Sequence, residues 1–271
     1  MAPVGVWIRV ADDLLRLDEA TERLRPFARH YVGIRPIPLA SIVGTEGRAG
    51  DFDRDFEARR TEVRERLRRV REAFPEGDFP PIVVSKLGDA YFVVDGHHRV
   101  AIARRRGAEM IDAEVTELSA RWRLDVNADR TELIHGQEEL MFMTESGLLD
   151  ARPDVCFTFS EPVGYRQLLE TIQVHGYQLM LGSGRPLARG DIARDWYSRV
   201  YLPTVDVIYA ERFDGVCPNA TDSDKFLWLY ERRRELAVAN GEQRLHEAAR
   251  QAIQAAAPTR RGLLKLIRAS R

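Results

Sequence analysis

The stretch of residues 92–107 constrains the fold most, because the sequence pattern changes there from that of a β-strand to that of an α-helix. Two short runs rich in β-branched and aromatic residues, 81–85 and 91–94, flank Gly88 and Asp89, which are typical of a hairpin turn. Asp95 and Gly96 break the second strand. The alanines and arginines that follow predict a short helix, and Gly107 is suited to end it with a left-handed cap.

This strand-to-helix turn has the properties of an anion-binding site. The first amides of a helix have no partner within it, and the positive end of its dipole would lie beside His97, His98 and Arg99. Gly96 has no Cβ, so a phosphate group can approach the backbone closely, and the Arg99 guanidinium is a forked donor for phosphate oxygens. The alternative is an ordinary turn in which both histidines only cap and pack.

The segment Asp95-Gly96-His97-His98-Arg99, at the end of a hairpin and the start of a helix, resembles the phosphate-binding segment of the ParB/sulfiredoxin-like superfamily. This superfamily includes chromosome-partitioning ParB proteins, which bind and hydrolyse CTP, ATP-dependent sulfiredoxins, and free-serine kinases that use ADP or ATP. The resemblance covers residues 34–118 and implies that the whole segment binds nucleotide phosphates. His97 occupies the position of the reactive cysteine of sulfiredoxins, so the resemblance itself excludes sulfinic-acid repair.

An acidic, glycine-rich stretch at residues 45–56 offers further candidates for chemistry. Glu46 is a candidate general base, and the resemblance supports it because free-serine kinases place an acidic residue in the loop after this strand. Asp53 is a candidate magnesium ligand. Alternatively, these acids cap the following helix and face water. His98 matches the histidine of the sulfiredoxin-type phosphate loop, and Glu46 and His98 are the catalytic candidates.

Two functions follow from these residues and from the resemblance. The first is a nucleotide-binding enzyme that uses ATP, ADP or CTP with Mg²⁺, either as an NTPase or as a kinase that transfers a phosphoryl group to a small hydroxyl acceptor. The second is a DNA-associated partition or regulatory protein, or a nuclease-like one, in which the nucleotide acts as a switch. A third interpretation is a scaffold whose turn holds a structural anion. A homodimer is a further expectation.

The predicted fold class is α+β, a small ParB/sulfiredoxin-like mixed-sheet domain followed by a mainly helical C-terminal region. The predicted boundaries are 1–32 for an N-terminal amphipathic helix, with helical spacing over 9–30, then 33–120 for the domain and 121–271 for the helical region. Within the helical region, residues 155–159 predict a strand, the aromatic residues near 196–201 predict a helix facing the core, and 259–271 predict a basic amphipathic tail.

Composition limits the partners of the chain. The formal net charge of −1 argues against a protein that binds DNA through its overall charge. No run of about 18 apolar residues and no signal-peptide pattern occur, so we expect a cytoplasmic protein without a membrane segment. Residues 64–71 hold five arginines that could form a nucleic-acid face, but the interspersed glutamates favour a solvated, ion-paired surface.

Overall fold

The computed structural model describes residues 13–74, 79–213, 220–240, 247, 249–251 and 253. The chain divides into two compact units, Met1–Gln137 and Glu138–Arg271. The first unit contains a mixed β-sheet and the second is helical, so the predicted α+β class, a small mixed-sheet domain followed by a mainly helical region, is confirmed. The predicted tail at 259–271 lies outside the described residues.

Among the described residues of the first unit, six strands form one sheet in the order β1-β3-β5-β4-β6-β2. β3 runs parallel to both β1 and β5, and β4 runs parallel to β6, whereas the β4/β5 and β2/β6 pairs are antiparallel. The predicted hairpin is confirmed as β4 and β5, with Gly88 at φ 66 in its turn. The strands are β1 Leu15–Arg16, β2 Ala28–Pro38, β3 Ile42–Thr45, β4 Ile82–Leu87, β5 Ala90–Asp95 and β6 Met110–Ser119.

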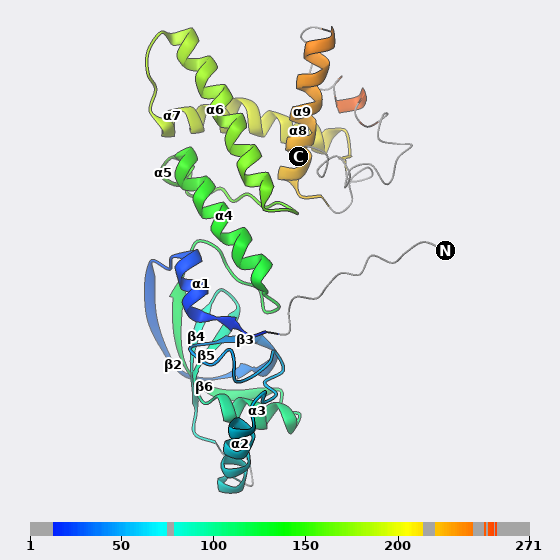
Figure 1. Ribbon diagram of the computed structural model, residues 1–271. Coiled ribbons are helices and arrows are strands. Elements are labelled where there is room, and N and C mark those ends of the chain that lie inside the picture. Colours follow the sequence, from blue (N-terminus) through cyan, green and yellow to red (C-terminus); the bar gives the residue numbers. More distant parts are fainter. Residues whose placement is uncertain are drawn as a thin grey trace, which may run out of the picture. The chain divides into compact units, whose positions relative to one another are not determined.

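Different helices cover the two faces of this sheet (Figure 1). Leu67 of α2 and Val100 of α3 belong to the core on one face, and Leu24 of α1 belongs to the core on the other. Strands β3 and β5 contribute residues to both cores, as parallel strands buried on both faces do. These helices are α1 Leu17–Leu24, α2 Thr61–Ala73 and α3 His97–Arg105.

The N-terminal helix is shorter than the sequence predicts. Of residues 13–30, the described part of the predicted range, Leu17–Leu24 is helical, and Leu15–Arg16 before it forms β1. Arg25 ends the helix in a left-handed conformation at φ 44, and the chain enters β2 at Ala28. The helical spacing of residues 27–30 is overridden because these residues find backbone partners in β6, including a bond from the amide of Phe27 to the carbonyl of Ser119 at 2.8 Å.

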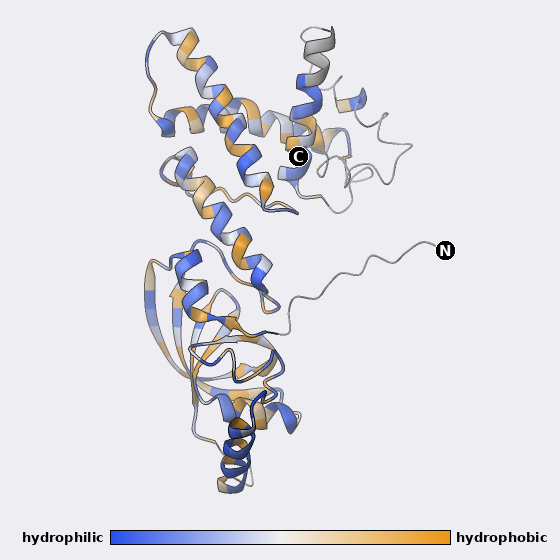
Figure 2. Ribbon diagram, viewed as in Figure 1, coloured by the Kyte–Doolittle hydropathy of each residue, from blue (hydrophilic) through white to orange (hydrophobic). Residues whose placement is uncertain are grey.

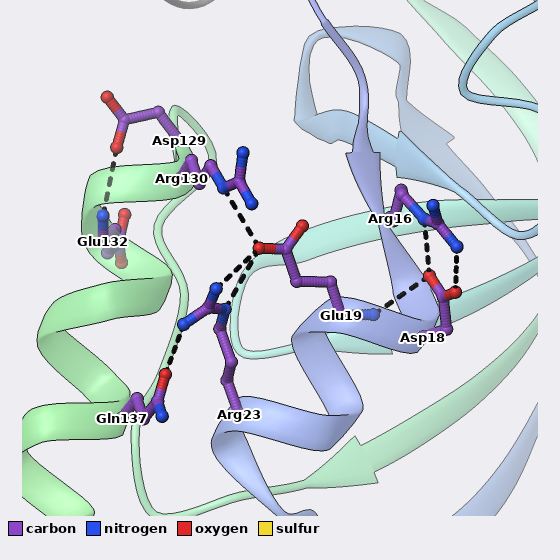
Figure 3. A network of polar contacts seen from close by, with 8 residues as sticks. All are labelled: Arg16, Asp18, Glu19, Arg23, Asp129, Arg130, Glu132 and Gln137. Carbon is purple, nitrogen blue, oxygen red and sulfur yellow. Dashed lines mark hydrogen bonds and ion pairs between the residues drawn. The ribbon is translucent and has the colours of Figure 1, made fainter.

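An ion pair and a hydrogen bond attach α1 to the first turns of α4 (Arg130–Ser146) within the same unit (Figure 3). Glu19 accepts from Nε of Arg23 and from Nε of Arg130, both at 3.1 Å. Arg23 also bonds the side-chain oxygen of Gln137. Leu24 packs near Gly136, where a Cβ would lie 2.4 Å from Cδ2 of the leucine. The start of α4 therefore closes the face of the sheet that α1 covers.

The second unit is helical in its described part and has an aromatic core. The predicted strand at 155–159 is wrong: Val155, Phe157 and Phe159 are buried and the residues between them are exposed, but the segment pairs with no described strand. The alternating pattern correctly indicates which side chains face the core, but these side chains pack against helices and not against another strand. None of the described helices is long and apolar enough to cross a membrane. The remaining helical elements are α5 Leu148–Ala151, α6 Val163–Ser183, α7 Arg189–Trp196, a π-helical turn Tyr197–Tyr201, α8 Leu202–Ala210 and α9 Asp222–Asn240.

Candidate functional site

The turn between β5 and α3 lies where the sequence predicts it. Gly96 has φ 99 and ψ 18, a left-handed conformation that favours glycine, and a Cβ there would lie 2.5 Å from Cγ2 of Ile82 in β4. No side chain caps the helix, and the amide of Val100 bonds the carbonyl of Gly96 at 3.1 Å. The amides of residues 97–99 therefore precede the hydrogen-bonded ladder of the helix, where an anion can meet them.

His97 ties β3 to the start of α3. The residue is 3% exposed, its Nε2 shares a hydrogen bond with Oγ1 of Thr45, and its ring stacks on Phe52 at a centroid distance of 6.1 Å. Burial, followed by the nearby charge of Arg48, lowers the pKa of His97 to about 4. The imidazole is therefore neutral at neutral pH.

His98 keeps a hydrogen-bonding atom without a protein partner. Its Nε2 is buried and bonds no atom of the described residues, and its ring meets Phe52 edge-on at 5.5 Å. Burial, followed by the charges of Arg66 and Arg48, lowers the pKa of His98 to about 4. An unpaired buried polar atom costs about 1–3 kcal/mol, so a ligand that bonds Nε2 would remove a cost that the protein alone bears.

Arg99 is bound to the protein itself. Its Nη1 donates to the carbonyl oxygens of Pro80 and Pro81, each at 2.7 Å, and its Nη2 donates to Oδ2 of Asp95 at 2.6 Å. These bonds attach the residues that lead into β4 to the start of α3, and they leave the side chain 16% exposed. Arg99 and Asp95, both predicted to bind phosphate, are thus already paired with protein groups. The carboxylate of Asp95 would also repel a phosphate group.

Glu46 lies at the carboxyl end of β3, beside the last residues of β5. Its amide donates to the carbonyl of Val93 at 2.9 Å, and its side chain is exposed and makes no ion pair with a described residue. The carboxyl ends of β3 and β5 lie at the same edge of the sheet because the two strands are parallel. The structure therefore brings Glu46 to the edge where α3 begins.

Asp53 orders the loop that contains it. Its Oδ1 accepts from the amides of Asp55 at 3.0 Å and Glu57 at 2.8 Å. Burial lowers the pKa of Arg104, in the last turn of α3, and the negative charge of Asp53 opposes this shift. The charge of Asp53 is not among those that shift the pKa of either histidine. Within the described chain, no group of three or more His, Cys, Asp or Glu side chains could hold a metal ion. A single loop carboxylate suits Mg²⁺ only where substrate phosphates supply further ligands.

Three residues that the sequence did not single out complete the surroundings of the histidines. Phe52 is fully buried against both rings. The side chain of Arg48 is 41% exposed and pairs with Asp51 at 3.4 Å. Together with burial, its charge contributes to lowering the pKa of both histidines. Arg66 comes from α2, and its charge follows burial in lowering the pKa of His98. An aromatic residue among the aspartates of a polar loop was a signal for Phe52, whereas nothing in the sequence distinguished these two arginines from the others.

Residues 53–128 match the ParB N-terminal domain family. The chain contains a ParB-like domain. The match runs from the loop after β3 through α2, the β4/β5 hairpin, α3 and β6, so it confirms the resemblance that the segment at 95–99 suggested. No curated protein matches the chain.

The ParB-like match covers the candidate residues unevenly. The turn at 95–99, Asp53 and Arg66 lie within the matched range, whereas Glu46 and Arg48 precede it. Strands β1 to β3 also precede the match, although they belong to the same sheet as the matched strands. The family comparison therefore includes the turn at residues 95–99. It does not include Glu46, whose place near the turn is known only from the fold.

Proposed function

We propose that the ParB-like domain binds the phosphate groups of a nucleotide at the start of α3. The single observation that carries this proposal is the buried, unpartnered Nε2 of His98 beside the left-handed Gly96 turn. The neutral imidazole can donate one hydrogen bond, the amides of residues 97–99 can donate others, and the charges of Arg48 and Arg66 favour an anion. Arg99 holds the turn in place, and its bonds to two carbonyl oxygens must persist for the turn to keep its shape.

The proposed reaction is hydrolysis of the nucleotide or transfer of a phosphoryl group to a small hydroxyl acceptor. ATP, ADP and CTP all carry phosphates that this turn could bind. The oxygen of water or of the acceptor forms a bond to the terminal phosphorus, the bond to the leaving nucleotide oxygen breaks, and Glu46 accepts the proton. Mg²⁺ would neutralise phosphate charge, with Asp53 as the candidate carboxylate ligand.

Calorimetric titration with ATP, ADP and CTP, each with and without Mg²⁺, tests the proposal. We expect at least one of the three to bind and the variant His98→Gln to bind it more weakly. His30→Gln is a matched control, because His30 is an exposed residue of β2 in the same unit. Absence of binding at millimolar nucleotide would refute the proposed function.

Glu46→Gln separates chemistry from binding. A general base contributes about 10²–10⁴-fold to a rate, so this variant should retain nucleotide affinity and lose turnover by such a factor. If Glu46→Gln hydrolyses nucleotide at the rate of the unchanged protein, Glu46 is not the base.

The ParB-like match also supports a second function, a DNA-associated partition or regulatory role in which the nucleotide is a switch. Retention of duplex DNA that weakens steeply as salt rises would support it. A mobility-shift experiment at low salt without any retention would exclude it. A homodimer stays a prediction, which the molar mass in solution would test.

A further inference from the structure

Helix α2 divides its exposed arginines between two flanks. At about 100° per residue, Arg64, Arg68 and Arg71 fall within about 60° of each other, and we call these three residues the arginine stripe. Arg66 and Arg69 lie on the opposite flank, and Val63 and Leu67 between the two flanks are buried in the core. All five arginine residues are exposed, and Figure 2 shows that most residues of α2 are hydrophilic.

The glutamates of α2 leave the stripe largely uncompensated. By the same geometry, Glu62 and Glu65 lie roughly 90° or more from the centre of the stripe. Glu72 reaches Nε of Arg68 at 3.9 Å, but both side chains are about two-thirds exposed (67% and 66%), so water weakens this pair. Arg71 makes no ion pair with any described residue. The glutamates therefore do not neutralise this flank, although their interspersed positions in the sequence suggested that they would.

The stripe is costly to the isolated protein. Like charges at i,i+4 spacing destabilise a helix by about 0.2–0.5 kcal/mol per pair, and Arg64 and Arg68 form such a pair. Arg64 is partly compensated, because its Nε donates to the carbonyl of Ala58 at 3.3 Å and its charge lowers the pKa of Glu57. A negatively charged partner would turn this repulsion into attraction. At the C-terminal end of α2, Nη2 of Arg106 bonds the carbonyl of Phe74 at 3.1 Å, which places a further positive charge there.

We infer that the arginine stripe of α2 contacts the phosphodiester backbone of nucleic acid without reading its sequence. The stripe rises about 10 Å along the helix, and a duplex carries one charge per about 1.7 Å of its axis, so such a linear polyanion can engage all three guanidinium groups. A membrane fits less well, because the large apolar residues of α2, Val63, Leu67 and Val70, pack against the core and do not face outward to insert among lipids. The inference rests on the second function above and is independent of nucleotide binding at α3.

Two matched variants of the full chain test this surface in the absence of nucleotide. R68Q/R71Q and R29Q/R35Q each remove two exposed arginines, one pair from the stripe and the other from β2 of the same unit. Retention of a duplex of random sequence is measured by fluorescence anisotropy from low to physiological salt. R68Q/R71Q should weaken binding about tenfold or more at low salt and lower the salt slope by about 2, whereas R29Q/R35Q should leave both nearly unchanged. Equal melting temperatures establish that both variants fold.

The possible results distinguish the stripe inference from the DNA-associated function. Equal losses for the two variants would show that overall charge matters and the stripe does not, which overturns the inference. Retention by the unchanged chain that R68Q/R71Q does not weaken would overturn the inference and leave the DNA-associated function standing. No retention by the unchanged chain would overturn both. If the chain instead binds anionic lipid vesicles or a polyglutamate peptide, and R68Q/R71Q weakens that binding, the stripe has a different anionic partner and the inference is overturned.

Discussion

The two units of the chain hold their structures together by different means. In the first unit, charged side chains hold irregular backbone: Arg99 donates to the carbonyls of two prolines, and Arg104 donates to those of Leu39, Ile42 and Arg54 at 2.8–2.9 Å. In the second unit, aromatic rings pack against one another, and Phe157 alone contacts four of them at centroid distances of 5.1–6.4 Å.

This difference indicates where a ligand can bind. In the first unit, Arg99 bonds carbonyl oxygens and does not cap α3. The amides at the start of α3 and Nε2 of His98 beside them therefore have no protein partner among the described residues. In the second unit, the hydroxyl of Tyr165 donates to the carbonyl of Phe157 and that of Tyr201 bonds Ser223. Nε1 of Trp196 is buried there without a partner among the described residues, but it lies among the aromatic rings of the core. The ParB-like match also lies wholly within the first unit. The second unit is therefore expected to depend on packing, and the first on polar contacts and on pH.

The largest expected effect is on the aromatic core. Phe157→Ala deletes a side chain that is 1% exposed, and such deletions cost about 3–5 kcal/mol because a cavity remains. Denaturant unfolding measures the loss, and nucleotide affinity should not change. If the variant does not fold, Phe157→Leu tests the same point at a cost of about 1–1.5 kcal/mol. A fall in nucleotide affinity in the folded variant would contradict the separation of the two units.

The pH dependence of stability should come from the first unit. The pKa of His97 is lowered to about 4 in the folded state, whereas the unfolded histidine has a pKa near 6.5, so between these values the unfolded chain binds more protons. Stability is therefore complete above about pH 6.5 and is lost as the pH falls towards about 4, by up to about 3 kcal/mol from His97. Unfolding midpoints across this range measure the loss. His97→Gln should make the curve shallower but not flat, because the pKa of His98 is also lowered to about 4. An unchanged curve would show that His97 does not contribute to it.

Loss of the hydrogen bonds of Arg99 should cost nearly as much stability as the protonation of His97. Arg99→Lys keeps the charge but cannot bridge two carbonyls and a carboxylate, and we expect it to cost about 2 kcal/mol, since hydrogen bonds to charged groups contribute about 1.5–3 kcal/mol. Thermal unfolding measures the cost. A variant with unchanged stability and abolished nucleotide binding would instead identify Arg99 as a direct phosphate ligand.

Two glycines with left-handed conformations give a matched comparison of turn geometry. Gly96→Ala brings a Cβ within 2.5 Å of Ile82 and should cost about 2 kcal/mol or more, because strain at φ 99 adds to the clash. Gly107→Ala meets no atom within 4 Å at φ 71 and should cost about 1 kcal/mol. Equal losses, measured by unfolding, would show that close packing against β4 does not matter at Gly96.

The smallest expected effect is electrostatic. Arg66→Gln removes a charge that lowers the pKa of His98, so this pKa should rise slightly towards its ordinary value. Titration of the imidazole by NMR measures the change, and Arg69→Gln on the same flank of α2 is the control. Equal shifts in the two variants would show that Arg66 has no special position relative to His98.

Much of the first unit could be predicted from residues alone. The hairpin, the Gly96 turn and the helix ending at Gly107 follow from local rules, since each depends on residues close together in the sequence. The partners of Arg99 could not be predicted, because the Pro80 and Pro81 carbonyls reach it only once β4 pairs with β5. The strand predicted at 155–159 failed for a related reason: alternation shows which side chains are buried but not whether another strand is there to pair.

By itself, the sequence determined the strand-to-helix turn and placed one glycine and two histidines in it, because backbone preferences and short-range hydrogen bonding decide these features. The tertiary structure alone decided which polar atoms near the turn already have partners: Arg99 is occupied by carbonyl oxygens, and Nε2 of His98 is not. It also decided that Arg48 and Arg66, from a loop and from another helix, act on the same imidazole. Burial and charge act through space, and only the packing of strands and helices brings these residues together.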